Sequence, residues 1–563
     1  MNNGHKKYTP FTPIEKPCRR WPARQLTAAP AWCSVDLRDG NQALVNPMRM
    51  EDKLELFHLL CEIGVKEIEV GFPSANETEY ETLRALIEGG HILQDVSIQV
   101  LVQAREHLIR RTFEAIEGAK NVIVHFYNST SALQRKVVFQ TDMQGVVDIA
   151  VGGARLVKAL GDDFTARTGA RLRYEYSPES YMGTEPENAV WVCSEVMRAL
   201  GASPENKIIL NLPSTVECCL PNQFADLVED FCDRLPDREN AIISLHPHND
   251  RGTATATAEL GLLAGAERLE GTLFGNGERT GNCDLVNMAL NLYSQGVDPG
   301  LDFSDLGRIR EFYERTTRMR VPERHPYAGD LVFTAFSGSH QDAINKGYRW
   351  MKEHPGGRWE IPYLPLDPAD LGLQYVPVVR INNQSGKGGA AFVMEKSFGY
   401  RLPKAMHPEF GTAVTAFCDS VAREITPEEV LALFKKEYID YKGKYTLVSQ
   451  KFGDVDDPDE ESVVRFRGKL DCTDTGIVEI TGDGNGPIDA FFNALQQVGI
   501  TGYRFIDYNE HAVSVGADAK GAAYIQLASP EGKMLFGVGL SHNINYAAAR
   551  AVLCAVNRGL AQE

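Results

Sequence analysis

Short apolar runs recur through the first half of the chain, and each is followed by a polar or glycine-bearing turn and then a longer segment with helical spacing. Runs of this length that are rich in β-branched residues indicate buried strands, and their alternation with helical segments indicates parallel pairing. Eight strands in about 250 residues match a closed (β/α)8 TIM barrel, so the sequence predicts an α/β fold of that kind. A doubly wound open sheet is the alternative. The eight runs are residues 31–37, 67–72, 97–102, 121–127, 172–177, 208–213, 242–247 and 268–274.

Uncommon polar residues gather at the carboxyl ends of these runs. In barrel enzymes, the loops that follow the strands build the active site at those ends. We therefore expect side chains that are far apart in sequence to converge on one rim of the barrel. They are Asp39, His125, Ser177, Glu179, Asn211, Thr215, His246 and His248, together with the segment "GNGERTGN" (275–282) after the eighth run.

The rest of the chain changes character twice. Residues 321–439 are rich in proline, aromatic residues and glycine, which is typical of a linker region with small helices. Beyond residue 440, strand-like runs alternate with two helical segments and predict a small α+β module. The sequence thus predicts an N-terminal extension (1–30), a barrel (31–320), linker subdomains (321–439) and a C-terminal α+β domain (440–563).

Charge and composition exclude several classes of partner. The 563 residues carry a formal net charge of -18, which would repel nucleic acid and anionic membrane surfaces over most of the protein. No apolar run reaches membrane-spanning length, and the polar, proline-rich N-terminus does not resemble a secretory signal. The eleven cysteines are scattered without CxxC spacing, as in proteins with reduced thiols. We expect a cytoplasmic enzyme or binding protein with no nucleic-acid or membrane partner.

The segment "LHPHND" suggests a metal centre. His246 and His248 are two apart in a predicted strand, so both imidazoles can face one point while Pro247 faces away. Two histidines and one carboxylate commonly hold a divalent ion with open positions for substrate oxygens. Asp39 is the best third ligand, because strands one and seven would be separated only by strand eight. An HxH pair alone is usually coincidental, but its place at a strand end favours a metal site.

Arg38 lies directly before this candidate ligand. A guanidinium group beside a cation is unfavourable unless it has a partner or a function. A substrate oxygen that becomes negatively charged would satisfy both the metal ion and Arg38, which suggests chemistry of that type. The structural alternative is an ion pair between Arg38 and Asp36.

Eight segments, in this order, resemble the 2-isopropylmalate synthase family, and the resemblance runs from about residue 8 to the C-terminus. Asn41 replaces the glutamate of the commoner "RDGEQ" motif, as in the long-chain branch that carries a C-terminal leucine-sensing domain. The segments are "DLRDGNQ", "KEIEVGFPSA", "VHFYNSTS", "YEYSPESYMGTE", "LHPHNDRGT", "GNGERTGN", "FSGSHQDAINKG" and "NQSGKGG".

The resemblance implies an acyltransferase that condenses acetyl-CoA with 2-oxoisovalerate and hydrolyses the thioester, in the first committed step of leucine biosynthesis. It implies a divalent ion, with Mg²⁺ as the first expectation and Mn²⁺, Zn²⁺ or Co²⁺ as alternatives. It also implies that Arg38 stabilises the new alkoxide, and that Glu179 and His340 act as acid and base with help from Tyr363. By the same resemblance, the metal shell is Asp39, His246, His248 and Asn282, and the pocket for the 2-oxo acid is His125, Ser177, Asn211 and Thr215.

The resemblance further implies a homodimer, in which the segment with His340 and Tyr363 reaches the partner's barrel. It implies a leucine site in the C-terminal domain around residues 482–487, 508–525 and 537–552, although a purely structural dimerisation module is the alternative. Three other activities stay open at this point. They are the same chemistry on another 2-oxo acid, as in homocitrate or citramalate synthases, a carbon–carbon lyase, and a catalytically inactive leucine sensor.

Overall fold

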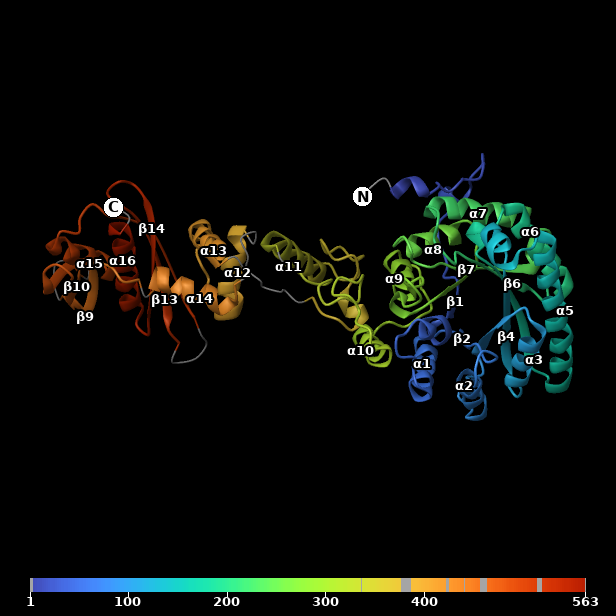
Figure 1. Ribbon diagram of the computed structural model, residues 1–563. Helices are drawn as coiled ribbons and strands as arrows, with labels where there is room; N and C mark the ends of the chain where they lie inside the picture. The colour runs from blue at the N-terminus through green and yellow to red at the C-terminus, as the bar shows by residue number, and fades with distance from the viewer. Residues whose placement is uncertain are drawn as a thin grey trace. The chain divides into compact units, whose positions relative to one another are not determined.

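The computed structural model describes residues 4–335, 337–375, 386–421, 425–439, 441–455, 463–513 and 519–561. The chain forms two compact units, each of which we describe by itself (Figure 1). The first comprises Met1–Phe333 and Leu366–Gln374, and the second comprises Thr334–Pro365 and Tyr375–Glu563.

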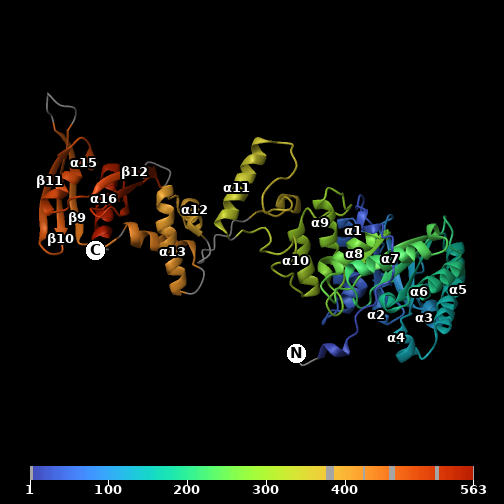
Figure 2. The same ribbon diagram turned by 90° about the horizontal axis from the view of Figure 1, so that it is seen from above.

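The first unit contains a closed barrel of eight parallel strands in sequential order, and β8 pairs with β1. The predicted barrel is therefore confirmed, and the open sheet is excluded. Helices surround the strands on the outside (Figures 1 and 2). The strands are β1 (Ala31–Ser34), β2 (Glu67–Gly71), β3 (Ser97–Gln103), β4 (Asn121–Ser129), β5 (Arg171–Glu179), β6 (Ile208–Pro213), β7 (Ala241–His246) and β8 (Arg268–Gly271).

The helices of this unit bury one apolar face against the barrel. In α3, for example, Ile109, Thr112 and Phe113 are buried at spacings of three and four residues, the spacing that places side chains on one helix face. The helices are α1 (Met50–Ile63), α2 (Glu77–Glu88), α3 (Glu106–Ala115), α4 (Ala132–Gln134), α5 (Met143–Thr168), α6 (Pro186–Leu200), α7 (Pro221–Arg234), α8 (Ala254–Leu263), α9 (Leu285–Ser294) and α10 (Leu306–Thr317).

The first strand is shorter than the apolar run that predicts it. β1 ends at Ser34, and Asp36–Gly40 form a π-helical turn closed by the bond from Gly40 N–H to the Val35 carbonyl oxygen (3.1 Å). Such turns occur frequently at functional sites. The Asn41 side chain then accepts a bond from the Met48 N–H (2.7 Å), so Asn41 holds this loop.

The second unit begins with α11 (Gly338–Glu353) and continues through α12 (Gly386–Phe398), α13 (His407–Val421) and α14 (Pro427–Phe434). Thr426 caps α14 in a capping box with Glu429. Two consecutive βββα repeats follow. The first is β9 (Tyr445–Val455), β10 (Val463–Cys472), β11 (Gly476–Gly484) and α15 (Pro487–Leu495), and the second is β12 (Arg504–Ala512), β13 (Gly521–Ala528), β14 (Met534–Ser541) and α16 (Ile544–Leu560).

Each repeat forms its own antiparallel three-stranded sheet, and both helices share one apolar core with the two sheets. Phe466 of β10, Phe491 of α15, Ile525 of β13 and Val552 of α16 all belong to this core. A second core joins the other face of β13 and β14 to α12, α13 and α14. The α+β character of this region is thus confirmed, although the sequence analysis did not anticipate β12.

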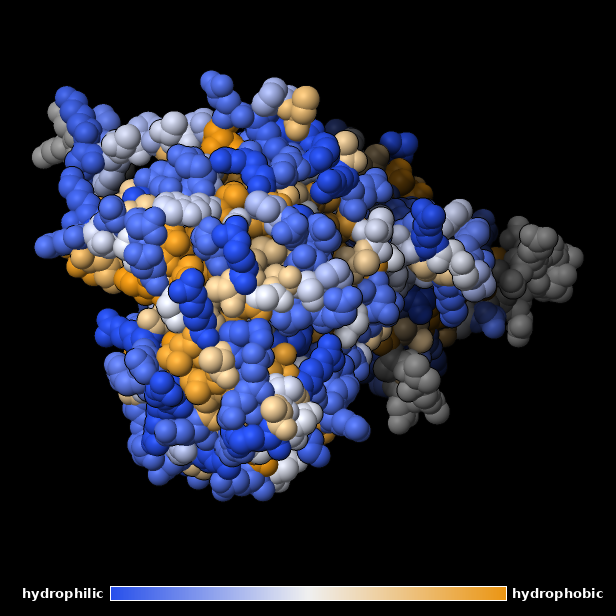
Figure 3. Space-filling model, turned by 90° about the vertical axis from the view of Figure 1, so that its right-hand side faces the viewer, coloured by the Kyte–Doolittle hydropathy of each residue, from blue (hydrophilic) through white to orange (hydrophobic). Residues whose placement is uncertain are grey.

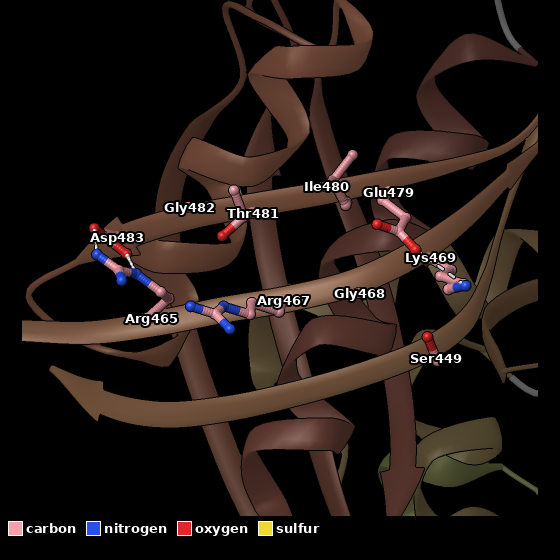
Figure 4. Close-up of a pocket in the computed structure, with 10 residues that line it drawn as sticks. All are labelled: Ser449, Arg465, Arg467, Gly468, Lys469, Glu479, Ile480, Thr481, Gly482 and Asp483. Atoms are coloured by element: carbon pink, nitrogen blue, oxygen red, sulfur yellow. Dashed lines mark hydrogen bonds and ion pairs between the residues drawn. The ribbon is translucent and has the colours of Figure 1, made fainter.

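The outer face of the β9–β10–β11 sheet is polar, and Figure 4 shows its cationic side chains along β10. Arg465 pairs with Asp483 across the sheet (2.6 Å), and Lys469 pairs with Glu479 (3.1 Å). Successive side chains of β10 point to opposite faces of the sheet. Phe466 therefore packs on the core, whereas Arg465 and Lys469 face solvent.

Glycines allow the two helices to lie directly on the third strand of each repeat. A Cβ atom on Gly539 would lie 1.9 Å from the Ala547 carbonyl oxygen, and one on Gly484 would lie 2.4 Å from the Ala490 nitrogen. Gly539→Ala should therefore lower the stability of the second unit by about 1–3 kcal/mol, because an added methyl overpacks the contact. Chemical denaturation would measure this loss. Gly453→Ala in β9 is the control, since nothing lies within 4 Å of its Cβ position, and an equal loss in both variants would contradict the explanation.

Two predicted features lie partly outside the described residues. They are the start of "NQSGKGG" (383–385) and residues 514–518 of the predicted leucine segment. Across the described parts of the chain, no helix has both the length and the apolar character needed to cross a membrane. On the face shown in Figure 3, hydrophobic residues are interspersed with hydrophilic ones.

Candidate active site and metal centre

One cavity of about 260 Å³ opens at the carboxyl end of the barrel, where the sequence predicts the site. Nine of the twelve candidate residues line it, and they come from the ends of five different strands. The nine are Arg38, Asp39, His125, Ser177, Glu179, Asn211, Thr215, His246 and His248. Asn282 lies beside them, because it forms a backbone bridge with His248. Gln42, Tyr127, Glu278 and Arg279 also line the cavity.

Asp39, His246 and His248 form a compact buried group. Asp39 Oδ2 lies 3.4 Å from His246 Nε2 and 3.9 Å from His248 Nε2, and one ligand atom from each residue falls within 4.8 Å of the others. Atoms that coordinate one ion at about 2.1 Å lie roughly 3–4 Å from each other. The spacing therefore suits a divalent ion in the centre of the group.

Unpartnered polar atoms test this fit independently. Asp39 Oδ2 and Asn282 Oδ1 are buried and have no hydrogen-bond partner among the described residues, whereas Asn282 Nδ2 donates to the Asn276 carbonyl oxygen (3.1 Å). A buried oxygen without a partner is costly, and a cation would satisfy both. The residues present thus fit a divalent metal ion.

The protonation states of the two histidines differ. Burial alone would lower the pKa of His246, but the neighbouring carboxylates of Asp39 and Glu270 outweigh this and raise the pKa to about 9. Burial and the neighbouring His246 charge lower the pKa of His248 to about 4, so this imidazole is neutral, as a metal ligand must be. Although burial opposes it, Arg38 and the histidines keep the pKa of Asp39 well below its usual range. A bound ion would take the place of the His246 proton.

Glu270 of β8 orients the imidazole ring of His246. Its carboxylate accepts from His246 Nδ1 at 2.8 Å, which leaves Nε2 facing Asp39. Metal-ligating histidines typically have such a carboxylate partner, which fixes the ring. The other Glu270 oxygen accepts from Gln99 (2.9 Å) and Arg268 (3.0 Å), so Glu270 is itself held in place.

The three charges of "DLRDG" have separate roles. Arg38 pairs with Asp39 (2.7 Å) and with Glu69 of β2, not with Asp36, within the described residues. Asp36 instead accepts from the Ser34 hydroxyl (2.8 Å) and the Leu273 N–H (3.1 Å), and burial raises its pKa to about 7. The predicted alternative of an Arg38–Asp36 pair is therefore wrong.

Glu69 connects Arg38 to the far side of the cavity. Its second oxygen lies 2.7 Å from His125 Nδ1, and His125 Nε2 lies 2.7 Å from the Ser177 hydroxyl. Asn211 Nδ2 also donates to Ser177 (3.1 Å), while Asn211 Oδ1 is buried and has no partner within the described ranges. These groups form a polar wall that can bind a small anionic substrate.

His340 and Tyr363 lie in the second unit, in the segment Thr334–Pro365. Their rings stack with centroids 4.0 Å apart, and both side chains are exposed. Tyr363 also has a left-handed backbone (φ 66°). The two rings thus contact each other and are accessible to a partner or substrate.

The sequence analysis did not single out a layer of charged residues inside the barrel. All of them are buried, and they form a continuous network beneath the candidate metal centre. Their signal is a charged or amide residue at inward positions of an otherwise apolar strand. They are Glu67, Glu69, Gln99, Glu175, Arg268 and Glu270.

The fold and the site together define a metal-dependent barrel enzyme, and the family model described as HMGL-like matches residues 29–312. The model of the post-catalytic domain of alpha-isopropylmalate synthase matches residues 330–395, and that of the LeuA allosteric (dimerisation) domain matches residues 424–560. The chain belongs to the 2-isopropylmalate synthase family, and it is an acyltransferase of leucine biosynthesis with a C-terminal allosteric domain.

Two relatives illustrate this membership. The 2-isopropylmalate synthase of Clostridium acetobutylicum is 53% identical over 98% of this chain and 99% of its own length. That of Rhodospirillum rubrum is 50% identical over 99% of both chains. Among solved structures, the hydroxymethylglutaryl-CoA lyase of Pseudomonas aeruginosa matches with a TM-score of 0.43 and 18% identity, over 53% of this chain and 97% of that one.

Proposed function

We propose that the protein joins the methyl carbon of acetyl-CoA to the keto carbon of 2-oxoisovalerate and then hydrolyses the thioester, which yields 2-isopropylmalate and CoA. The observation that carries this proposal is the buried group of Asp39, His246 and His248 beside Arg38, in a cavity with room for a small 2-oxo acid. Membership of the family supports the choice of substrates.

We propose Asp39, His246 and His248 as the protein ligands of a divalent ion, with Asn282 next to them. Such an ion supplies Lewis-acid chemistry, because it polarises a carbonyl oxygen. Two imidazoles and a carboxylate accept Mg²⁺, Mn²⁺, Zn²⁺ or Co²⁺, and the intracellular availability of each metal decides among them.

Arg38 is positioned to donate hydrogen bonds to a developing oxyanion. Its Nε is bound to Glu69 and its Nη1 to Asp39, so the planar guanidinium is held in one orientation with donors to spare. His125, Ser177, Asn211 and Thr215 would bind the carboxylate and side chain of the 2-oxo acid. The fixed guanidinium of Arg38 is an effective donor because it needs no reorganisation during the reaction.

The proposed proton transfers involve Glu179, His340 and Tyr363. One of these groups removes a methyl proton from acetyl-CoA, and the resulting enolate attacks the keto carbon. The new alkoxide takes up a proton, and water then cleaves the thioester to a carboxylate and the CoA thiol. Glu179 accepts from the Ser129 hydroxyl at the rim of the cavity. His340 and Tyr363 would act from a partner subunit, so we propose a homodimer.

We propose that leucine inhibits the enzyme by binding the C-terminal domain around residues 482–487, 508–525 and 537–552. The same domain would hold the dimer together, as the name of its family model suggests. We also propose the division into an extension (1–30), a barrel (31–320), linker subdomains (321–439) and a regulatory domain (440–563).

The test is release of free thiol from acetyl-CoA by the purified, metal-supplied protein with 2-oxoisovalerate, pyruvate or 2-oxoglutarate, each with and without leucine. We expect the fastest release with 2-oxoisovalerate and suppression by leucine. Faster release with another acid would indicate a homocitrate or citramalate synthase, and no release would indicate a lyase or a sensor. The full chain is the right sample, because Val430, Phe434 and Tyr438 pack in a core with β13 and β14, and truncation near residue 430 would cut through it.

A further inference from the structure

One arginine joins three loops at the carboxyl end of the barrel. Arg279, in the loop after β8, donates from Nε to Asp250 Oδ1 (2.7 Å) and from Nη2 to Asp250 Oδ2 (3.2 Å), in the loop after β7. Its Nη2 also donates to the carbonyl oxygen of Thr215, in the loop after β6. Asp250 in turn accepts from the Glu217 N–H (2.9 Å), which adds a second hydrogen bond to the loop after β6.

The backbone at both ends of this connection is strained. Thr215 and Arg279 have left-handed backbones, with φ of 56° and 58°. This region is unfavourable for residues with a Cβ, most of all for a β-branched residue such as threonine. Strained conformations persist only where the surrounding structure imposes them, and they occur often at functional sites.

Thr215 is held from two sides. Arg279 binds its carbonyl oxygen, and its hydroxyl accepts from the N–H of Ser180 (2.8 Å), which also has a left-handed backbone (φ 62°). Both Thr215 and Arg279 line the cavity that contains Asp39 and His246. The hydrogen bond from Arg279 to the Thr215 carbonyl oxygen therefore helps to fix the direction in which the Thr215 side chain enters this cavity.

We infer that Arg279 is a positioning residue for the 2-oxo acid, acting through Thr215. Its Nε and Nη2 are bound to Asp250 and to the Thr215 carbonyl oxygen, so the guanidinium fixes the shape of this side of the pocket. The inference rests on the proposed function, in which Thr215 belongs to the 2-oxo acid pocket. It assigns to the loop after β8 a part in substrate fit that is separate from metal binding.

The test compares Arg279→Ala with Arg251→Ala in steady-state kinetics. We expect Arg279→Ala to raise the KM for 2-oxoisovalerate between about tenfold and a hundredfold, the loss of affinity that follows when a buried polar contact is left unmade. The kcat and the bound metal should change far less. Arg251 is the matched control, because it is an exposed arginine of the same rim, and its loss removes an equal charge near an anionic substrate.

Two further measurements separate positioning from a general structural role. Guanidinium ion added to Arg279→Ala should bring the raised KM part of the way back to the wild-type value, because the ion can occupy the vacated space between Asp250 and Thr215. Asp250→Asn should raise the KM in the same direction, and the double variant should be no worse than the poorer single one, as expected for residues of one network.

The outcomes are distinct. If the wild type releases no CoA from any 2-oxo acid, the proposed function fails. If the wild type is active and Arg279→Ala behaves like Arg251→Ala, the positioning role is refuted. Loss of bound metal in Arg279→Ala, or a raised KM without any guanidinium rescue, would also refute it, because the residue would then only maintain the fold.

Discussion

Replacing Asp39 with asparagine is expected to remove the bound divalent metal and to lower turnover by at least about a thousandfold. Asp39 Oδ2 faces both His246 Nε2 and His248 Nε2, and it is buried without a hydrogen-bond partner in the part of the chain that the structure describes. An asparagine keeps the shape but loses the negative charge, and the site then offers only neutral ligands to the ion. Outer-shell changes alone typically cost 10–100-fold in metal affinity, so the loss of a charged ligand should cost more.

Asp36→Asn is the control for this experiment. Asp36 lies in the same turn, but it serves the backbone through the Leu273 N–H and the Ser34 hydroxyl, and an asparagine can bond to both. Elemental analysis after dialysis, together with CoA release, would measure both variants. Retention of metal and turnover in Asp39→Asn would show that the ion is held elsewhere. Loss of metal in both variants would show that the intact turn, and not the Asp39 carboxylate specifically, is what the ion requires.

Arg38→Lys should lower kcat by about a hundredfold to a thousandfold, as removal of one oxyanion donor does in other enzymes. The guanidinium of Arg38 spans Asp39 and Glu69 at the same time, and a lysine ammonium is a single point that cannot reproduce this planar fork. The charge near the metal is retained, so metal content should not change.

Arg49→Lys provides a comparison for this loss, because Arg49 is exposed and pairs only with Asp52 among the described residues. Steady-state CoA release with saturating substrates would measure kcat, and elemental analysis would verify the metal. Equal kcat values for both lysine variants and the wild type would exclude Arg38 from the chemistry.

The sequence predicts the barrel well because its strands are nearly continuous apolar runs. It fails where local structure departs from that pattern. The run from Ala31 predicts a strand to residue 37, but the π-helical turn at Asp36–Gly40 interrupts it, and apolar periodicity does not reveal such a turn. β12 was missed because most of its residues are exposed, and its sequence shows no regular alternation of apolar and polar residues.

The candidate metal ligands were predictable because histidines and an aspartate at strand ends are unusual. Glu69 and Glu270 were not, because each is a single charged residue inside a strand, and only the inward pleat of a closed barrel shows that it faces the site. The role of Arg279 also depends on backbone angles and on contacts between three loops. Neither is visible in residue types or their spacing.

The N-terminal segment has a practical consequence for recombinant work on this enzyme. Glu229 of α7 is fully buried, and it accepts from the N–H groups of Arg20 (3.1 Å) and Trp21 (3.0 Å). The neighbouring Asp226 accepts from Arg19 Nε (2.7 Å) and Trp21 Nε1 (3.0 Å). A shortened version that starts after Trp21 would leave both carboxylates without these partners, so an affinity tag should be added in front of this segment and should not replace it.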